Sequence, residues 1–142
     1  MRPREGFELD WLATDERGVV ALFSTAGGGY VPRQVLSVAE AHDAAVDALL
    51  EAPRTTSASF AEAVAPGLEN PWEAAAARGV FVYDSDFFGG PYRLVAAPLV
   101  PRLVTDASDP LAASAILLRL TGVRLGDDAV LDAQALEAAC RE

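Results

Sequence analysis

Four carboxylates follow one another at helical spacing in a segment without basic residues. They are Glu40, Asp43, Asp47 and Glu51, at intervals of three and four residues within 37–53. At 100° per residue this spacing predicts that all four lie on one side of a helix. A row of negative charge attracts and orients a cationic protein surface, because complementary potentials raise the association rate and set specificity. An ordinary solvated helix face has the same pattern, and this alternative stays open.

A second candidate contact is aromatic. Phe87 and Phe88 are adjacent in the segment DSDFFGGP at 84–91, whose aspartates and glycines are typical of a turn. Two adjacent aromatic side chains at such a tip cannot both enter the core, so one is expected to be exposed as an anchor. Aromatic residues are enriched among those that dominate the free energy of binding at interfaces. The sequence therefore predicts six partner-binding residues: Glu40, Asp43, Asp47, Glu51, Phe87 and Phe88.

The same segment begins like a calcium-binding loop but does not complete the pattern. Asp84 and Asp86 occupy the first and third ligand positions, and Gly89 occupies the sixth. Phe88 and Val95 stand at the fifth and twelfth positions, where oxygen ligands are needed. We therefore predict no metal site here and interpret the two aspartates as solvated turn residues.

One histidine, His42, and one cysteine, Cys140, are the other groups with catalytic potential. They are too few for a zinc site built from such ligands. Helical spacing predicts an apolar stripe of Val38, Ala41, Ala45, Leu49 and Ala52, with His42 at its border. We interpret Cys140 as a structural residue in a C-terminal helix. The sequence thus predicts no catalytic residue, no metal ligand and no cofactor.

The glycine run Gly27–Gly29 raises the question of a phosphate-binding loop. A Walker A loop needs a lysine, and all eleven basic residues of the chain are arginines. A dinucleotide fingerprint needs a third spaced glycine, and Pro32 stands in its place. Two alternative functions stay open: a small-molecule-binding or enzymatic domain with a pocket near residues 27–29, and a structural or oligomerisation module.

Composition narrows the class of partner. The 142 residues are 51% hydrophobic and 23% charged, as in globular chains, and the formal net charge is −10. Nucleic acids and anionic membranes both bind through cationic side chains, so neither is an expected partner, whereas a basic protein is attracted. The charged residues 1–5 lack a following apolar run, and a single cysteine is typical of a reducing compartment. We therefore expect a cytoplasmic protein.

Alternation and turn residues predict two β-hairpins. Phe7, Leu9 and Trp11 alternate with acidic residues, which predicts one apolar and one acidic sheet face, and Gly18 permits a short turn. The second pair is expected at 80–83 and 92–97. Capping boxes predict helices that start at Ser37 and Ser59, and further helices are expected at 70–78, 108–120 and 132–141. Together these elements predict one α+β domain over 1–142, with an antiparallel sheet of two β-hairpins packed against several helices.

Three segments, FELDWLATDERGVVALFSTAGGG, RGVFVYDSD and PYRLVAAPLVP, resemble small bacterial immunity proteins, the partners of secreted polymorphic toxins, and their uncharacterised relatives. The resemblance covers roughly half of the chain. It implies a cytoplasmic single-domain protein that binds and blocks a toxin domain, often a basic nuclease. It implies no particular site residues, because the shared motifs are structural.

Overall fold

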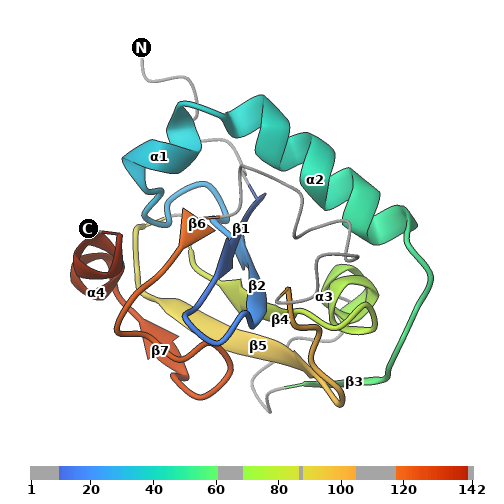
Figure 1. Cartoon of the computed structure of the whole chain (residues 1–142). Helices are drawn as coiled ribbons and strands as arrows, with labels where there is room; N and C mark the ends of the chain where they lie inside the picture. Colours follow the sequence, from blue (N-terminus) through green and yellow to red (C-terminus); the bar gives the residue numbers. More distant parts are fainter. Residues whose placement is uncertain (1–9, 61–68, 87, 105–117, 141–142) are drawn as a thin grey trace.

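One mixed sheet forms the centre of the protein (Figure 1). The computed structural model describes residues 10–60, 69–86, 88–104 and 118–140. Within them the strand order is β3-β5-β4-β2-β1-β6, and β7 also pairs with β5. The strands are β1 (Asp10–Thr14), β2 (Val20–Ser24), β3 (Ala58–Phe60), β4 (Phe81–Asp84), β5 (Tyr92–Pro98), β6 (Leu118–Arg119) and β7 (Val130–Leu131).

Both predicted hairpins are present, as β1–β2 and β4–β5. The α+β fold class is therefore confirmed. The prediction of a wholly antiparallel sheet is wrong, because β2 and β4 are parallel and so are β1 and β6. A parallel pair needs a long crossover connection, and the chain between β2 and β4 supplies α1, α2, β3 and α3. The hairpins therefore join side by side through a crossover.

The turn between β1 and β2 is held by a buried carboxylate. Asp15 Oδ1 accepts hydrogen bonds from the backbone N of Arg17 at 2.8 Å and of Val19 at 3.2 Å. Its Oδ2 accepts from Arg17 Nη2 at 2.8 Å and from the backbone N of Leu125 at 3.0 Å. Gly18, at φ 84°, completes the turn in a conformation that favours glycine. Asp15 thus ties the first hairpin to the chain after β6.

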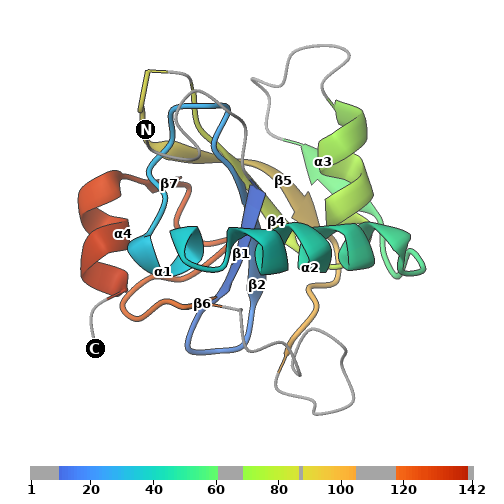
Figure 2. The same cartoon turned by 90° about the horizontal axis from the view of Figure 1, so that it is seen from above.

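Helices cover both faces of the sheet (Figures 1 and 2). One face packs against α2 (Ala39–Glu51) and α3 (Glu69–Ala76), and the other against α1 (Arg33–Leu36) and α4 (Ala133–Ala139). The prediction of a polar outer face for the first hairpin is therefore wrong. Trp11 and Leu12, which point to opposite faces, are both fully buried.

An aromatic row, defined here as Trp11, Phe23, Tyr83 and Tyr92, crosses the four central strands. The rings of Trp11 and Phe23 stack with centroids 4.2 Å apart, and those of Phe23 and Tyr83 stack at 5.1 Å. Tyr92 meets Trp11 and Phe23 edge-on. Its hydroxyl accepts a hydrogen bond from Trp11 Nε1 at 3.2 Å and donates to Tyr30 O at 2.8 Å.

The predicted capping boxes do not form. Ser37 Oγ donates to Gln34 O at 3.0 Å, because Ser37 follows α1, and α2 begins at Ala39 without a side-chain cap. The buried side of α2 consists of His42, Val46 and Leu49, whereas the predicted stripe consisted of Val38, Ala41, Ala45, Leu49 and Ala52. The helix is thus rolled by part of a turn relative to the prediction.

Other helix predictions have mixed outcomes. The start expected at Ser59 is wrong, since Ala58–Phe60 is the strand β3. The helices near 70–78 and 132–141 are confirmed as α3 and α4, and Asp132 Oδ1 caps α4 by accepting from Ala135 N at 2.8 Å. The helix expected at 108–120 lies mostly outside the described residues, and its last residues include β6.

We expect stability to fall at alkaline pH because the tyrosines of the aromatic row are buried. Burial raises the pKa of Tyr83 to about 12 and raises that of Tyr92 above the usual range. The neutral phenols therefore stabilise the fold fully below the unfolded-state pKa of about 10, and this contribution is lost as pH rises through the folded-state values. Urea unfolding followed by tryptophan fluorescence should show a decline between about pH 10 and 12.

Phenolate absorbance recorded over the same range is the direct control. The absorbance should rise at a higher pH than that of an exposed tyrosine, together with unfolding. A full phenolate signal with a midpoint near pH 10, in a chain that stays folded, would contradict the burial of these hydroxyls. Tyr83→Phe should lower stability at neutral pH, because Gly126 N and Asp128 O lose their partner, and should make the alkaline decline shallower.

Candidate functional site

The four acidic residues that the sequence predicts to contact a partner lie together on the outer side of α2. Glu40, Asp43, Asp47 and Glu51 are all exposed, and this set is called the acidic face below. Figure 1 shows α2 along the outside of the molecule. The prediction of a shared helix side is confirmed, whereas contact with a partner stays a prediction.

Three of the four carboxylates of the acidic face differ from the other described carboxylates, because their side chains have no intramolecular partner. Within the described part of the chain, the side chains of Glu40, Asp47 and Glu51 make no hydrogen bond and no ion pair. Asp43 does have an interaction with the rest of the chain. So does every other carboxylate whose side chain the structure describes: Asp10, Asp15, Glu16, Glu73, Asp84, Asp86, Asp127, Asp128, Asp132 and Glu137.

The C-terminal part of the acidic face, from Asp43 to Glu51, opposes the stability of its own helix, whereas Glu40 lies in the first turn, where a negative charge is favourable. No basic residue occurs in the last turn of α2, and Glu51 is its final residue. A negative charge at a helix C-terminus is unfavourable by about 0.3–1 kcal/mol, because the helix dipole is negative there. Asp47 lies four residues from both Asp43 and Glu51, and like charges at that spacing cost about 0.2–0.5 kcal/mol per pair. A cationic surface placed against this face would remove both penalties.

Phe88 is the most exposed large apolar residue of the described chain, at 92%. Asp86 fixes the backbone beneath it, since Asp86 Oδ1 accepts from Phe88 N at 2.8 Å and from Gly90 N at 3.0 Å. The predicted exposure of one aromatic residue is therefore confirmed for Phe88. Phe87 lies outside the described residues, so its predicted role is not addressed by the structure.

The acidic face and Phe88 do not form one continuous surface. The connection between β4 and β5 lies apart from α2 in both views (Figures 1 and 2). This connection lies instead beside the glycine run, because a Cβ on Gly89 would approach Gly28 O to 3.3 Å. A partner that contacts both the acidic face and Phe88 would have to span two separate parts of the surface.

The glycine run packs against the protein itself. The backbone N of Gly28 and Gly29 both donate to Thr25 O, at 3.1 and 2.8 Å. A Cβ on Gly29 would lie 2.7 Å from Tyr92 Oη and 2.8 Å from Ser85 Cβ. Close approach to these side chains therefore explains the glycine at position 29, and this counts against a ligand-binding role for the loop itself.

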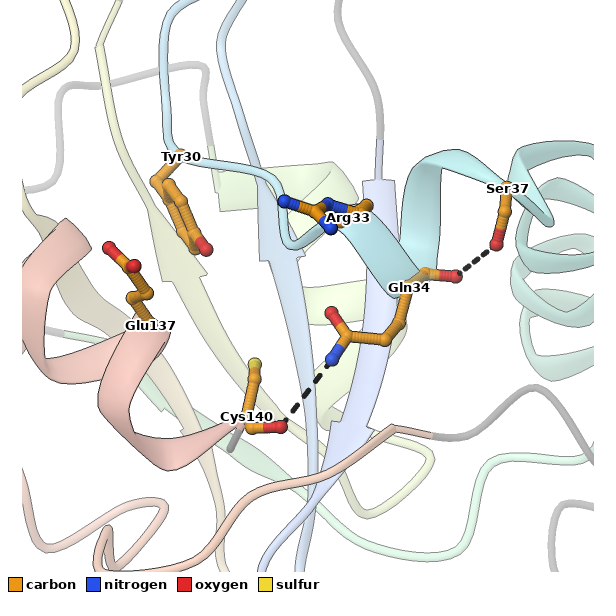
Figure 3. Close-up of a pocket in the computed structure, with 6 residues that line it drawn as sticks. All are labelled: Tyr30, Arg33, Gln34, Ser37, Glu137 and Cys140. Carbon is orange, nitrogen blue, oxygen red and sulfur yellow. Dashed lines mark hydrogen bonds between the residues drawn. The ribbon is translucent and has the colours of Figure 1, made fainter. Parts of the chain in front are cut away.

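A cavity of about 430 Å³ lies one residue beyond the glycine run, between α1 and α4 (Figure 3). The sequence left open a pocket near residues 27–29, but it did not indicate these walls, because they are separated by about a hundred residues of chain. The residues that line it are Tyr30, Arg33, Gln34, Ser37, Glu137 and Cys140.

The cavity has no activated nucleophile. Burial raises the pKa of the Cys140 thiol, so the thiol stays protonated at neutral pH, and the thiolate is the reactive form. Burial, assisted by Cys140 and Glu137, also raises the pKa of Tyr30, and Arg33 opposes this shift. The arrangement therefore favours binding over covalent catalysis.

His42 is buried instead of lying at a border, with 1% of its surface exposed. Its Nδ1 accepts a hydrogen bond from the backbone N of Leu12 at 3.2 Å. The parallel pairing of β1 with β6 involves Ala13 and Thr14, so His42 provides an acceptor for β1 just before that pairing begins. This geometry gives His42 a structural role.

Among the described residues, no group of three or more His, Cys, Asp or Glu side chains could hold a metal ion. The described helices are also too short or too polar to cross a bilayer. Comparison with known proteins gives no match to a family model, to a curated protein or to a solved structure. The resemblance to immunity proteins therefore stays a prediction, and the functional argument rests on the geometry above.

We expect His42→Leu to lower the free energy of unfolding by about 1–3 kcal/mol, because a buried backbone N–H loses its acceptor. Chemical denaturation measures this change. Ala44→Leu is the matched control, since it adds a leucine to the exposed side of the same helix and should change stability by at most about 0.5 kcal/mol. Equal stability of His42→Leu and wild type would show that Leu12 N finds another acceptor.

The tip that carries Phe88 gives a separate test. Phe88→Ala should change the free energy of unfolding by at most about 0.5 kcal/mol, because the ring is exposed. Gly90→Ala should loosen the tip, since the added Cβ would lie 2.5 Å from Asp86 Oδ2. Amide hydrogen exchange at Phe88 measures this effect. If Gly90→Ala leaves the protection of that amide unchanged, Asp86 does not hold the tip.

Proposed function

We propose that this protein is a non-enzymatic binding protein whose acidic face docks onto a basic surface of a protein partner. The role that fits best is that of an immunity protein that neutralises a basic toxin in the cytoplasm. The observation that carries this proposal is that the side chains of Glu40, Asp47 and Glu51 on α2 have no partner within the described chain, and that Asp47 and Glu51 weaken their own helix. Sites that violate local stability rules are frequently functional.

Charge and dimensions define the partner. The net charge of −10 attracts a basic protein over distance and disfavours nucleic acid and anionic membranes. From Glu40 to Glu51 the helix rises by roughly 16 Å at about 1.5 Å per residue. A partner would therefore present arginine or lysine side chains along a ridge or groove of similar length. Phe88 provides a second contact only for a partner large enough to reach the β4–β5 connection.

The variant Asp47→Asn/Glu51→Gln tests the proposal. It should keep or slightly increase the free energy of unfolding, by up to about 1 kcal/mol, because repulsion and the unfavourable dipole interaction are removed. It should nevertheless bind a basic partner more weakly and with a smaller dependence on salt. A substitution that weakens binding while preserving stability separates a docking role from a structural one.

The partner would be captured from native lysate on immobilised wild-type protein, released by salt, identified, and expressed to measure its toxicity. Wild type should relieve that toxicity, and Asp47→Asn/Glu51→Gln should relieve it less. Gln134→Lys/Ala138→Lys is the matched control, because it changes the net charge by the same two units on exposed positions of α4. Equal protection by wild type and the α2 variant would contradict docking through the acidic face.

A further inference from the structure

A second cavity, of about 370 Å³, lies beyond the C-terminal end of α2 and is called the helix-end cavity below. The residues that line it are Ala52, Pro53, Thr55, Val100, Pro101 and Arg102. Ala52 is the residue that ends α2, and it follows Glu51 directly. The last carboxylate of the acidic face is therefore next in the chain to a residue of the cavity wall.

Hydrogen bonds fix both segments that line the helix-end cavity. Arg78 Nε donates to Ala52 O at 2.8 Å and so holds the chain at the end of α2. In the other segment, Val100 N donates to Thr56 Oγ1 at 3.0 Å, while the Val100 residue is 63% exposed. The backbone is thus held in place and an apolar side chain is left uncovered. A site that is formed in advance lowers the entropy cost of binding.

The lining favours an aromatic occupant. Apolar surface comes from four residues: Ala52, Pro53, Val100 and Pro101. Arg102 adds a positive charge that repels a lysine or arginine side chain, whereas a guanidinium stacks on the face of an aromatic ring. Arg102 also interacts with the rest of the chain. Stacking is compatible with that interaction, because it uses the flat face of the guanidinium and leaves the N–H groups in its plane available.

We propose that the helix-end cavity receives an aromatic side chain of the basic protein that docks onto the acidic face, an inference that rests on the docking function proposed above. A partner whose cationic side chains follow the row from Glu40 to Glu51 reaches the cavity at the end of that row. The carboxylates attract any basic protein over distance. The cavity adds a short-range contact, of the kind that dominates the free energy of binding at interfaces, and so selects one basic protein among others.

The test uses two synthetic peptides, hexa-arginine followed by glycine and tryptophan, and hexa-arginine followed by glycine and alanine. Six extended residues span roughly 20 Å, which covers the roughly 16 Å from Glu40 to Glu51. Fluorescence anisotropy at one salt concentration should show the tryptophan peptide binding about tenfold more tightly, because its ring is transferred from water into the cavity. Backbone amide shifts at residues 52–55 and 100–102 should change with the tryptophan peptide only. Equal affinity of the two peptides would overturn the proposal.

A variant of the lining assigns the effect to the helix-end cavity. Val100→Asn should remove most of the advantage of the tryptophan peptide, because it replaces apolar lining surface with an amide and leaves the net charge unchanged. Val130→Asn is the matched control, since Val130 is an exposed valine of β7 outside the cavity, and it should keep the tenfold difference. Circular dichroism confirms that both variants are folded. An undiminished advantage of the tryptophan peptide in Val100→Asn would contradict this site.

The variant Asp47→Asn/Glu51→Gln separates this proposal from the docking function on which it rests. It should weaken the binding of both peptides and leave the ratio of their affinities unchanged. Two equal affinities that both fall in this variant would overturn the aromatic site while supporting the acidic face. Binding of both peptides that does not respond to this variant would contradict the acidic face itself, and the aromatic site as a part of it.

Discussion

The aromatic row is the interaction on which the rest of the structure depends. It takes one ring from each of β1, β2, β4 and β5, and therefore joins the two hairpins across their parallel boundary. Each aromatic contact adds about 0.5–1.5 kcal/mol beyond the burial of apolar area. The Tyr92 hydroxyl extends the row to Tyr30 and so positions the chain that leads into α1. Packing in the core thus sets the position of one wall of the cavity.

The sheet is covered on both faces, and this separates the two candidate sites. On one face α2 presents its exposed carboxylates away from the sheet, while His42, Val46 and Leu49 anchor its inner side. On the other face an open cavity lies between α1 and α4. Each of these two surfaces is therefore built on helices whose inner sides are fixed by the core.

Predictions from sequence succeeded where the information was local. The two hairpins, α3, α4 and the exposure of the acidic face all follow from spacing and turn residues within one segment. The capping boxes at Ser37 and Ser59 failed because tertiary contacts outweighed a capping preference of about 1 kcal/mol. In the first case α1 occupies the chain before Ala39, and in the second Ala58–Phe60 pairs with β5. The border position expected for His42 failed because the roll of α2 is set by its packing on β1.

The sequence by itself determined the charge of the protein, its α+β class and the exposure of the four acidic residues of α2, because these depend on composition and on short periodicities. The tertiary structure alone decided that β2 and β4 pair in parallel, that both sheet faces are buried, and that Arg33 and Glu137 face one cavity. These features join residues far apart in the chain. Such contacts depend on loop-closure entropy and on the shape of the whole core, which the order of residues within any one segment does not specify.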